Sequence, residues 1–395
     1  MYHLAEKKSK LKIKSLKLKN FRNYELLNLE LDGSTNIFYG DNAQGKTNIL
    51  EAVYLSGTTK SHRGSKDRDM IQFGAEESHI EVIVEKRGIQ DQIDMHLKKN
   101  RPKGVAINKI PIRKAGELFG IVNLVFFSPE DLNIIKNGPA GRRKFIDLEL
   151  SQLDKVYFNH LSNYSRIVNQ RNHLLKDSAY RQDAMETLDI WDLQLVQYGN
   201  AIIARRKQFV DEMNEIVSGI HKKLTGGKEE IRLIYEPSTK NMSLEQALEM
   251  NRQRDIRMKS TSVGPHRDDV CFMVGNLDIR RFGSQGQQRT AALSLKLAEI
   301  ELVKRVIGDT PVLLLDDVLS ELDKHRQNYL LDSIHDIQTV ITCTGLDEFV
   351  NHRFSINKIF RVSSGSVTKE NYEVFKGVQQ VLNLMQNMEQ TRSKY

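Results

Sequence analysis

The chain has 395 residues, of which 39% are hydrophobic, and its 59 Lys and Arg against 51 Asp and Glu give a net charge of +8. This length predicts two or three domains. No stretch reaches the roughly 18 apolar residues of a membrane span, and the only cysteines are Cys271 and Cys343, which argues against a membrane protein, a disulfide framework and a structural zinc site. We expect a cytoplasmic protein with no membrane partner, whose basic excess serves either solubility or binding to nucleic acid.

The N-terminal part of the chain is predicted to consist mostly of strands. Apolar residues and lysines alternate over residues 11–19, with a slip at Ser15, and leucines alternate again before an Asp-Gly turn signal, which indicates a hairpin. The run STNIFYG predicts a short strand, and a helical pattern follows over residues 48–55. Short alternating runs over residues 80–112 predict an antiparallel side sheet.

Two long amphipathic helices are predicted in the middle of the chain. Apolar residues recur every three or four positions over 153–168 and again over 188–224, and no proline occurs between Pro139 and Pro237. The polar segment 176–185 permits a turn, so we expect an antiparallel helical hairpin. An ordinary helical domain with no special role is the alternative.

The C-terminal part returns to an α/β pattern. PVLLLDD and TVITCTG are continuous apolar runs, as buried parallel strands require. Residues after about 376 are polar apart from one short apolar patch, which predicts a terminal helix or a frayed end.

The segment GDNAQGKT (40–47) matches the phosphate-binding pattern G-x-x-x-x-G-K-[ST] and lies between a predicted strand and a predicted helix. Its glycines let backbone N–H groups surround phosphate oxygens, Lys46 reaches the β- and γ-phosphates, and the Thr47 hydroxyl ligates Mg²⁺. A chance match is the alternative, and the flanking strand and helix argue against it. We therefore predict a site for ATP and Mg²⁺ at Gly40, Asp41, Asn42, Ala43, Gln44, Gly45, Lys46, Thr47 and Asn48.

Two carboxylates end the run VLLLDD. An aspartate at the end of a buried strand is unfavourable unless it holds a cation or a water. We assign Asp316 to Mg²⁺ through water and Asp317 to the attacking water, so the predicted catalytic residues are Lys46, Asp316 and Asp317. Strand-end carboxylates that merely face solvent are the alternative. The wide separation of Lys46 from Asp316 is unlike that in small GTPases and nucleotide kinases, and it indicates a split ATPase head with an insertion.

The segment FGSQGQQRT opens a predicted helix upstream of VLLLDD, and the exposed N–H groups of a helix N-terminus favour an anion. This order of motifs resembles ABC-type ATPases, whose signature loop binds the γ-phosphate of a nucleotide held by a second molecule. The resemblance implies that Ser284, Gln285, Gly286 and Gln287 complete the ATP site of another copy in an ATP-dependent homodimer. It also implies that residues 320–323, SELD, form a D-loop at the dimer interface. A glycine turn that caps a core helix is the alternative.

Within that class the sequence resembles the RecF family. The motifs LKNFRNY, GDNAQGKTNILEA, SPEDL, GPAGRRKFID, VGPHRDD and GSQGQQRT occur in the order found in the family, over residues 10 to about 365. The resemblance implies a DNA-repair factor that hydrolyses ATP slowly and in response to DNA, binds DNA at gaps or junctions, and works with RecR and RecO to load recombinase. It further implies that Arg22 and Asn23 lie near the phosphates and base of the nucleotide.

The fold expected from these motifs is an α/β, ABC-type P-loop ATPase head, with a parallel or mixed sheet, an antiparallel side sheet and an inserted α-helical hairpin. We place the discontinuous head at 1–145 and 255–375, the insertion at 146–254, and a C-terminal tail at 376–395. Compared with the wider class, Asp317 replaces a glutamate, and no histidine follows TVITCT, so Thr342 or Thr344 is the candidate contact of the γ-phosphate. Two rival functions remain: an ATPase subunit of another complex, such as a transporter, and a nucleotide-locked DNA clamp without useful turnover.

Four basic clusters compete as the DNA site. They lie at residues 12–19, 60–68, 98–103 and 142–144. We favour the second, where glycine and serine residues let a DNA backbone approach, with contacts from Lys60, Arg63, Lys66 and Arg68. Aromatic residues are sparse around this cluster, so we expect phosphate contacts rather than base stacking, and little sequence preference.

Overall fold

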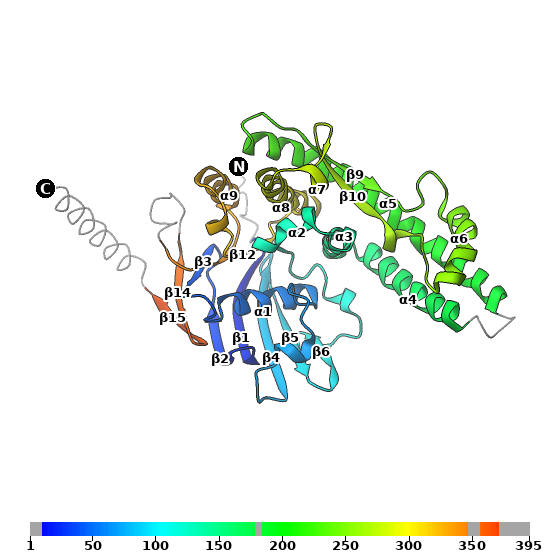
Figure 1. Ribbon diagram of the computed structural model, residues 1–395. Helices are drawn as coiled ribbons and strands as arrows, with labels where there is room; N and C mark the ends of the chain where they lie inside the picture. The colour runs from blue at the N-terminus through cyan, green and yellow to red at the C-terminus, as the bar shows by residue number, and fades with distance from the viewer. Residues whose placement is uncertain (1–9, 178–183, 347–355, 371–395) are drawn as a thin grey trace, which may run out of the picture. The chain divides into compact units, whose positions relative to one another are not determined.

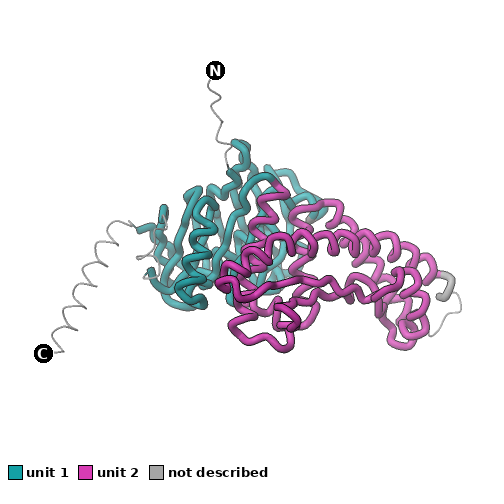
Figure 2. Tube along the Cα trace, turned by 90° about the horizontal axis from the view of Figure 1, so that it is seen from above, with its two compact units in different colours: residues 1–129, 308–395 teal, residues 130–307 magenta. Residues whose placement is uncertain are grey.

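The computed structural model describes residues 10–177, 184–346 and 356–370 (Figure 1). The chain forms two compact units, one of residues 1–129 and 308–395 and the other of residues 130–307 (Figure 2). Residues 130–145 and 255–307, which we assigned to the head, thus group with the helical residues. The predicted tail at 376–395 and most of the predicted turn between the long helices lie outside the described residues. Within the described ranges, no helix is both long and apolar enough to cross a bilayer.

The first unit contains a mostly parallel sheet in the order β15-β14-β3-β13-β12-β8. Its strands are β3 (Thr35–Tyr39), β8 (Leu124–Phe127), β12 (Val312–Asp316), β13 (Thr339–Cys343), β14 (Lys358–Ser363) and β15 (Ser366–Glu370). Only β15 runs antiparallel to its neighbour, in a hairpin with β14. The apolar runs of β8, β12 and β13 are buried, as predicted for the last two. The carboxyl ends of parallel strands share one edge of a sheet, so the loops after β3 and β12 meet there.

The antiparallel side sheet of the first unit is confirmed. Its strands are β1 (Lys12–Phe21), β2 (Tyr24–Glu30), β4 (Glu77–Lys86), β5 (Ile89–Lys98), β6 (Arg101–Ile107) and β7 (Ile110–Pro111), in the order β2-β1-β4-β5-β6-β7. The register of β1 on β4 shifts between Ile13 and Ser15, which accounts for the slip in the alternation. Helix α1 (Lys46–Thr58) contacts strands of both sheets, and for that reason almost all of its residues are buried. The unit also contains the short 3₁₀ helix η1 (Asp67–Met70) and helix α9 (Lys324–Ile334).

The second unit is built around the predicted helical hairpin. Its helices are α2 (Leu132–Lys136), α3 (Pro139–Leu153), α4 (Lys155–Asp177), α5 (Ala184–Leu224), α6 (Leu244–Met258), α7 (Ile279–Phe282) and α8 (Gln285–Ile307). Two contacts show that helices α4 and α5 run antiparallel. Arg171 pairs with Asp192 near one end of the hairpin, and Tyr157 contacts Arg206 near the other. The sequence patterns missed α6 and a small antiparallel sheet of β9 (Ile231–Glu236), β10 (Asp269–Val274) and β11 (Leu277–Asp278).

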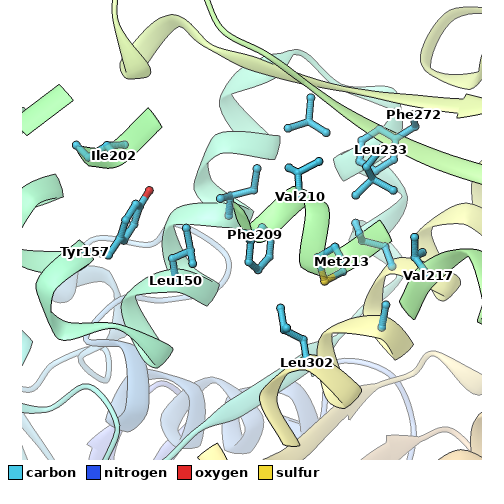
Figure 3. Packing of buried hydrophobic residues seen from close by; sticks show 14 of the residues in the cluster. Leu150, Tyr157, Ile202, Phe209, Val210, Met213, Val217, Leu233, Phe272 and Leu302 are labelled. Atoms are coloured by element: carbon cyan, nitrogen blue, oxygen red, sulfur yellow. The ribbon is translucent and has the colours of Figure 1, made fainter. Parts of the chain in front are cut away.

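Helix α5 forms the centre of the core of the second unit (Figure 3). Successive turns of this helix direct apolar side chains into one cluster, to which other helices and the small sheet contribute. Labelled members of the cluster are Leu150, Tyr157, Ile202, Phe209, Val210, Met213, Val217, Leu233, Phe272 and Leu302. The apolar residues that recur with the 3.6-residue period of α5 therefore face this core, as the sequence predicted.

Arg171 of α4 is completely buried in this unit. Arg171 donates to Asp255 Oδ2 over 2.7 Å and to Asp192 Oδ1 over 2.6 Å, and it also contacts Thr261 Oγ1 over 3.1 Å. Both Arg171 and Asp255 have side chains that are 0% exposed. A buried charge needs a partner of this kind, because removal of one member leaves the other desolvated and uncompensated.

We expect Arg171→Met to lower the free energy of unfolding of the second unit by about 3–5 kcal/mol, because it leaves Asp255 buried without its cation. Denaturant unfolding followed by fluorescence measures this effect, since Trp191, the single tryptophan, lies on α5. The matched control is Asp189→Asn, which removes the exposed partner of Arg252 and should change stability by less than about 1 kcal/mol. Equal effects of the two variants would contradict the prediction.

Candidate functional site

The phosphate loop connects β3 to α1, and its glycines are required sterically. Gly40 and Gly45 have φ angles of 152° and 110°. A Cβ on Gly40 would lie 2.3 Å from the carbonyl oxygen of Val362, and one on Gly45 would lie 2.4 Å from Nδ2 of Asn23. Larger residues at either position would displace the loop from the elements that surround it.

Lys46 is the first residue of α1 and is 4% exposed. Its Nζ donates to the carbonyl oxygens of Gly40 over 2.6 Å and of Asp41 over 3.1 Å, so the ammonium group lies inside the curve of the loop. An ammonium at this point can exchange its carbonyl contacts for phosphate oxygens, which carry a full negative charge.

Asp316 connects the two predicted nucleotide motifs. It ends β12 and accepts hydrogen bonds from the hydroxyls of Thr47 and Thr342, each over 2.8 Å. Burial raises the pKa of Asp316 above its ordinary value, although both hydroxyl bonds act in the opposite direction. The two hydroxyl groups and the carboxylate offer oxygen ligands, the type that Mg²⁺ prefers.

Asp317 follows Asp316 in an unusual backbone conformation. Its φ of 50° is in the left-handed region, and its N–H donates to the carbonyl oxygen and the hydroxyl of Thr342 over 3.2 and 3.1 Å. The hydroxyl of Thr342, one of the candidates for the γ-phosphate, is thus engaged by the carboxylate of Asp316 and the backbone N–H of Asp317, whereas Thr344 is exposed. A hollow of about 280 Å³ lies beside these groups, lined by Asn42, Ala43, Gln44, Gly45, Lys46, Thr47, Asn48, Arg63 and Asp317.

The outer side of the phosphate loop is held by two segments distant in sequence. Asn23 donates to the carbonyl oxygen of Gln44 over 2.9 Å and accepts from Asn48 Nδ2 over 2.8 Å. The tip of the β14–β15 hairpin contributes the N–H of Ser364, which donates to Gln44 Oε1 over 2.6 Å, and the N–H of Gly365, which donates to Gln44 O over 3.3 Å. Asn23 therefore lies against the loop, whereas no sequence pattern indicated the hairpin contact.

Arg22 is occupied by a buried carboxylate. Its guanidinium donates twice to Glu51 of α1, each time over 2.8 Å, and also to Ser65 Oγ and the carbonyl oxygen of Asp69, each over 2.7 Å. Burial alone would raise the pKa of Glu51, but hydrogen bonds from Arg22 and Ser61 bring it below its usual value. Arg22 thus joins α1 to the segment 61–69 and is not among the residues that line the small hollow.

The favoured basic cluster is exposed on the segment 60–68 and consists of Lys60, Arg63, Lys66 and Arg68. Arg63 Nη1 donates to Asn48 Oδ1 over 3.2 Å and lines the small hollow, so the cluster reaches the nucleotide motif. The Nε atom of Arg68 lies 3.5 Å from Oδ1 of Asp69. Within the described ranges, Lys60, Arg63 and Lys66 have no carboxylate within 4.0 Å.

The competing basic clusters are largely neutralised within the protein. Arg142, with a side chain 5% exposed, forms an ion pair with Asp269, and Arg143 donates to the carbonyl oxygen of Asp268. On the side sheet and its neighbouring loops, the lysines of the other clusters form the pairs Lys12–Glu85, Lys14–Glu85, Lys17–Glu81, Lys98–Glu77, Lys99–Glu76 and Lys103–Asp67. These clusters therefore offer a polyanion less unpaired positive charge than the segment 60–68 does.

In the second unit, the predicted signature residues open helix α8. Ser284 caps this helix: its Oγ accepts from the N–H of Gln287 over 3.2 Å, while Gln287 Oε1 accepts from the N–H of Ser284 over 3.0 Å. Gln287 Nε2 also donates to Glu229 over 2.9 Å. Ser284, Gln285 and Gly286 are exposed and thus accessible to another molecule.

Comparisons with known proteins agree on one family. A family model described as the RecF/RecN/SMC N terminal domain matches residues 12–368. The DNA replication and repair protein RecF of Agathobacter rectalis is 63% identical over 90% of this chain and 98% of its own, and that of Lachnospira eligens is 60% identical over 91% and 99%.

Solved structures extend this agreement to the fold. The recombination mediator protein RecF with ATP, described as part of the RecFOR pathway, matches 94% of this chain and 100% of its own with a TM-score of 0.87 and 34% identity. An Smc head domain from Pyrococcus furiosus matches with a TM-score of 0.55 and 16% identity, which is a likeness of fold alone. The fold is therefore an ABC-type ATPase head with a helical insertion, and the chain belongs to the RecF family.

Proposed function

We propose that this protein is an ATP-hydrolysing, DNA-binding factor of recombinational repair and replication restart. The hydrogen bond between Thr47 and Asp316 carries the proposal, because it joins the phosphate loop to the carboxylate pair at one edge of the parallel sheet. The family supports the same reading, since RecF relatives are described as replication and repair proteins and solved RecF structures contain ATP.

In the proposed reaction, the small hollow takes the phosphates of ATP. Lys46 exchanges the carbonyl oxygens of Gly40 and Asp41 for the β- and γ-phosphates. Thr47 and Asp316 hold Mg²⁺, which neutralises phosphate charge when bound. Asp317 lines the hollow and orients the attacking water. Because aspartate is one methylene shorter than glutamate, this contact is less direct and turnover is slow.

Lys46→Arg should abolish hydrolysis but retain or only weaken ATP binding, because a planar guanidinium keeps the charge without the compact shape of an ammonium. Asp316→Asn should abolish Mg²⁺-dependent hydrolysis, since a neutral amide is a poor cation ligand. Phosphate release and nucleotide binding measure the two effects. Asp332→Asn, on an exposed position of α9, is the matched control and should turn over normally. Full turnover by Lys46→Arg would remove Lys46 from the site.

The signature residues are proposed to act on the ATP of a second copy, in an ATP-dependent homodimer. Ser284→Arg should then leave nucleotide binding to the monomer intact and block dimerisation, because a bulky cation fills the space meant for the γ-phosphate of the partner. Ser284→Ala removes the same helix cap, at about 1 kcal/mol, without this bulk, so it should dimerise better than Ser284→Arg. Sizing in solution with and without ATP tests both; normal dimerisation and turnover by Ser284→Arg would exclude a role across the dimer.

Basic residues of the segment 60–68 are proposed to bind the DNA backbone. If about five phosphates are neutralised on a duplex, the log–log slope of affinity against salt should be about −4 to −5. Arg63→Ala combined with Arg68→Ala should flatten that slope by up to about two units. The control is Lys12→Ala with Lys17→Ala, because both lysines already pair with glutamates. An unchanged slope in the arginine variant would place the DNA elsewhere.

The pathway that is named for a solved RecF structure extends the proposal to partners. Since a RecF relative is described as part of that pathway, we infer that this chain works with RecR and RecO to load recombinase at gaps. The rival function that an observation still favours is a nucleotide-locked DNA clamp, because Asp317 stands where the ABC class has glutamate. Turnover that rises on addition of DNA supports the ATPase, whereas binding of DNA and ATP without turnover supports the clamp.

A further inference from the structure

The side chain of Gln287, the last of the four signature residues, is held at both of its polar atoms. Its Oε1 accepts from the N–H of Ser284 over 3.0 Å, and its Nε2 donates to Oε1 of Glu229 over 2.9 Å. Both polar atoms of this amide are thus engaged within the chain. Gln287 therefore forms a bridge between the first turn of α8 and the segment that leads into β9.

Glu229 is itself held by a buried histidine. Its Oε2 lies 3.4 Å from Nε2 of His221, in the last turn of α5, and this imidazole is 0% exposed while the Glu229 side chain is 26% exposed. The other ring nitrogen, Nδ1, lies 3.0 Å from Oγ of Ser294 on α8. The Ser294 hydroxyl donates its proton to the carbonyl oxygen of Thr290, so its oxygen accepts from the Nδ1–H of His221. The contact with α8 thus fixes the ring that faces Glu229.

A row of hydroxyl groups ties the same turn of α8 to His221 by a second route. Thr290 donates its hydroxyl to the carbonyl oxygen of Gly286 over 2.7 Å, and Ser294 donates to the carbonyl oxygen of Thr290 over 2.7 Å. The end of α5 therefore reaches the signature residues twice, once through the side chain of Gln287 and once through the carbonyl group of Gly286.

The backbone on either side of Glu229 is fixed as well. The N–H of Glu229 donates to Oγ1 of Thr225 over 3.3 Å, and that hydroxyl donates to the carbonyl oxygen of His221 over 2.9 Å. On the other side, the carbonyl oxygen of Glu230 accepts from the N–H of Gly275 over 3.2 Å, in the turn between β10 and β11. Glu229 is thus presented to α8 from an ordered support, and groups that are already ordered lose little conformational freedom when they bond.

We propose that Glu229, held by His221, is a positioning residue for the signature residues. The proposal rests on their proposed action on the ATP of a second copy, and it names what keeps them ready for that site. Without Glu229, the Gln287 side chain loses one of its two anchors, and the N–H of Ser284 loses a fixed acceptor. The first turn of α8 is then ordered only when a second copy binds, and this ordering weakens association.

Dimerisation with ATP is the first test. Glu229→Ala should raise the dissociation constant of the ATP-bound dimer by about 10-fold or more, the effect of a lost hydrogen bond to a charged group, while ATP binding by the monomer stays unchanged. Glu229→Gln is the conservative variant and should restore this constant to within about threefold of the parent protein. Its amide oxygen can accept from Gln287, and its amide nitrogen can donate to Nε2 of His221. Sizing over a range of protein concentrations, with and without ATP, measures these constants.

The matched control is Glu230→Ala, which removes the neighbouring exposed carboxylate and should dimerise like the parent protein. Unchanged dimerisation of Glu229→Ala would overturn the inference. An equal loss in Glu229→Ala and Glu229→Gln would overturn it too, because the charge of Glu229 would then matter and not its contact with Gln287. Denaturant unfolding shows that each variant is folded. Where Glu229→Ala is not folded, Glu229→Met, which keeps the volume beside His221 without an acceptor, takes its place.

A mixing experiment shows on which ATP site Glu229 acts. In a mixed dimer of Glu229→Ala with Lys46→Ala, one composite site is intact, because it joins Lys46 of the first chain to the signature residues of the second. This mixture should hydrolyse ATP at the rate of a reference mixture of Ser284→Arg with Lys46→Ala. Recovery in the reference mixture alone would place the effect of Glu229 on the ATP of its own chain and overturn the inference. Normal dimerisation and turnover by Ser284→Arg alone would instead show that the proposed role of the signature residues fails.

Discussion

The hydrogen bond between the Thr47 hydroxyl and the Asp316 carboxylate connects positions 269 residues apart, and the first unit is arranged so that it can form. The order β3-β13-β12 brings the phosphate loop and the carboxylate pair to one edge of the sheet, with β13 between them. Thr342 at the end of β13 completes the arrangement, since its hydroxyl donates to Asp316 and accepts from the N–H of Asp317. Residues 130–307 are therefore inserted in the chain between β8 and β12, two strands that pair in this sheet.

The phosphate loop depends on contacts that motif spacing does not describe. Gly40 lies against the backbone of Val362, and Gln44 is held by the hairpin tip at Ser364, so strands β14 and β15 set the outer wall of the loop. On the other side, Arg22 and Glu51 join the β1–β2 turn to α1. A substitution in the hairpin therefore acts on the nucleotide site without touching the nucleotide.

The sequence predicted the elements whose signal is local. Alternation identified the side sheet and even the slip at Ser15, continuous apolar runs identified β12 and β13, and helical periodicity identified α4 and α5. It did not identify β8, β14 or the small sheet of the second unit, because short strands owe their conformation to neighbours distant in the chain. Charge runs misled for a similar reason: Arg142 belongs to a basic run and yet is buried against Asp269. The full exposure of Phe73 could not be predicted from the sequence either, because phenylalanine is a residue type that is usually buried.

The start of α8 shows why two interpretations of one motif need not compete. The capping box between Ser284 and Gln287 accounts for the serine and the glutamine as ordinary stabilisers of a helix. It satisfies the N–H of Gln287, but it leaves the N–H groups of Gln285 and Gly286 at the exposed first turn, where no intrahelical acceptor exists. These donors point along the helix axis, at the end where the dipole favours an anion. The cap thus fixes the backbone in the geometry that a phosphate requires, so the structural role of Ser284 is a precondition for the proposed role of the loop in a second copy.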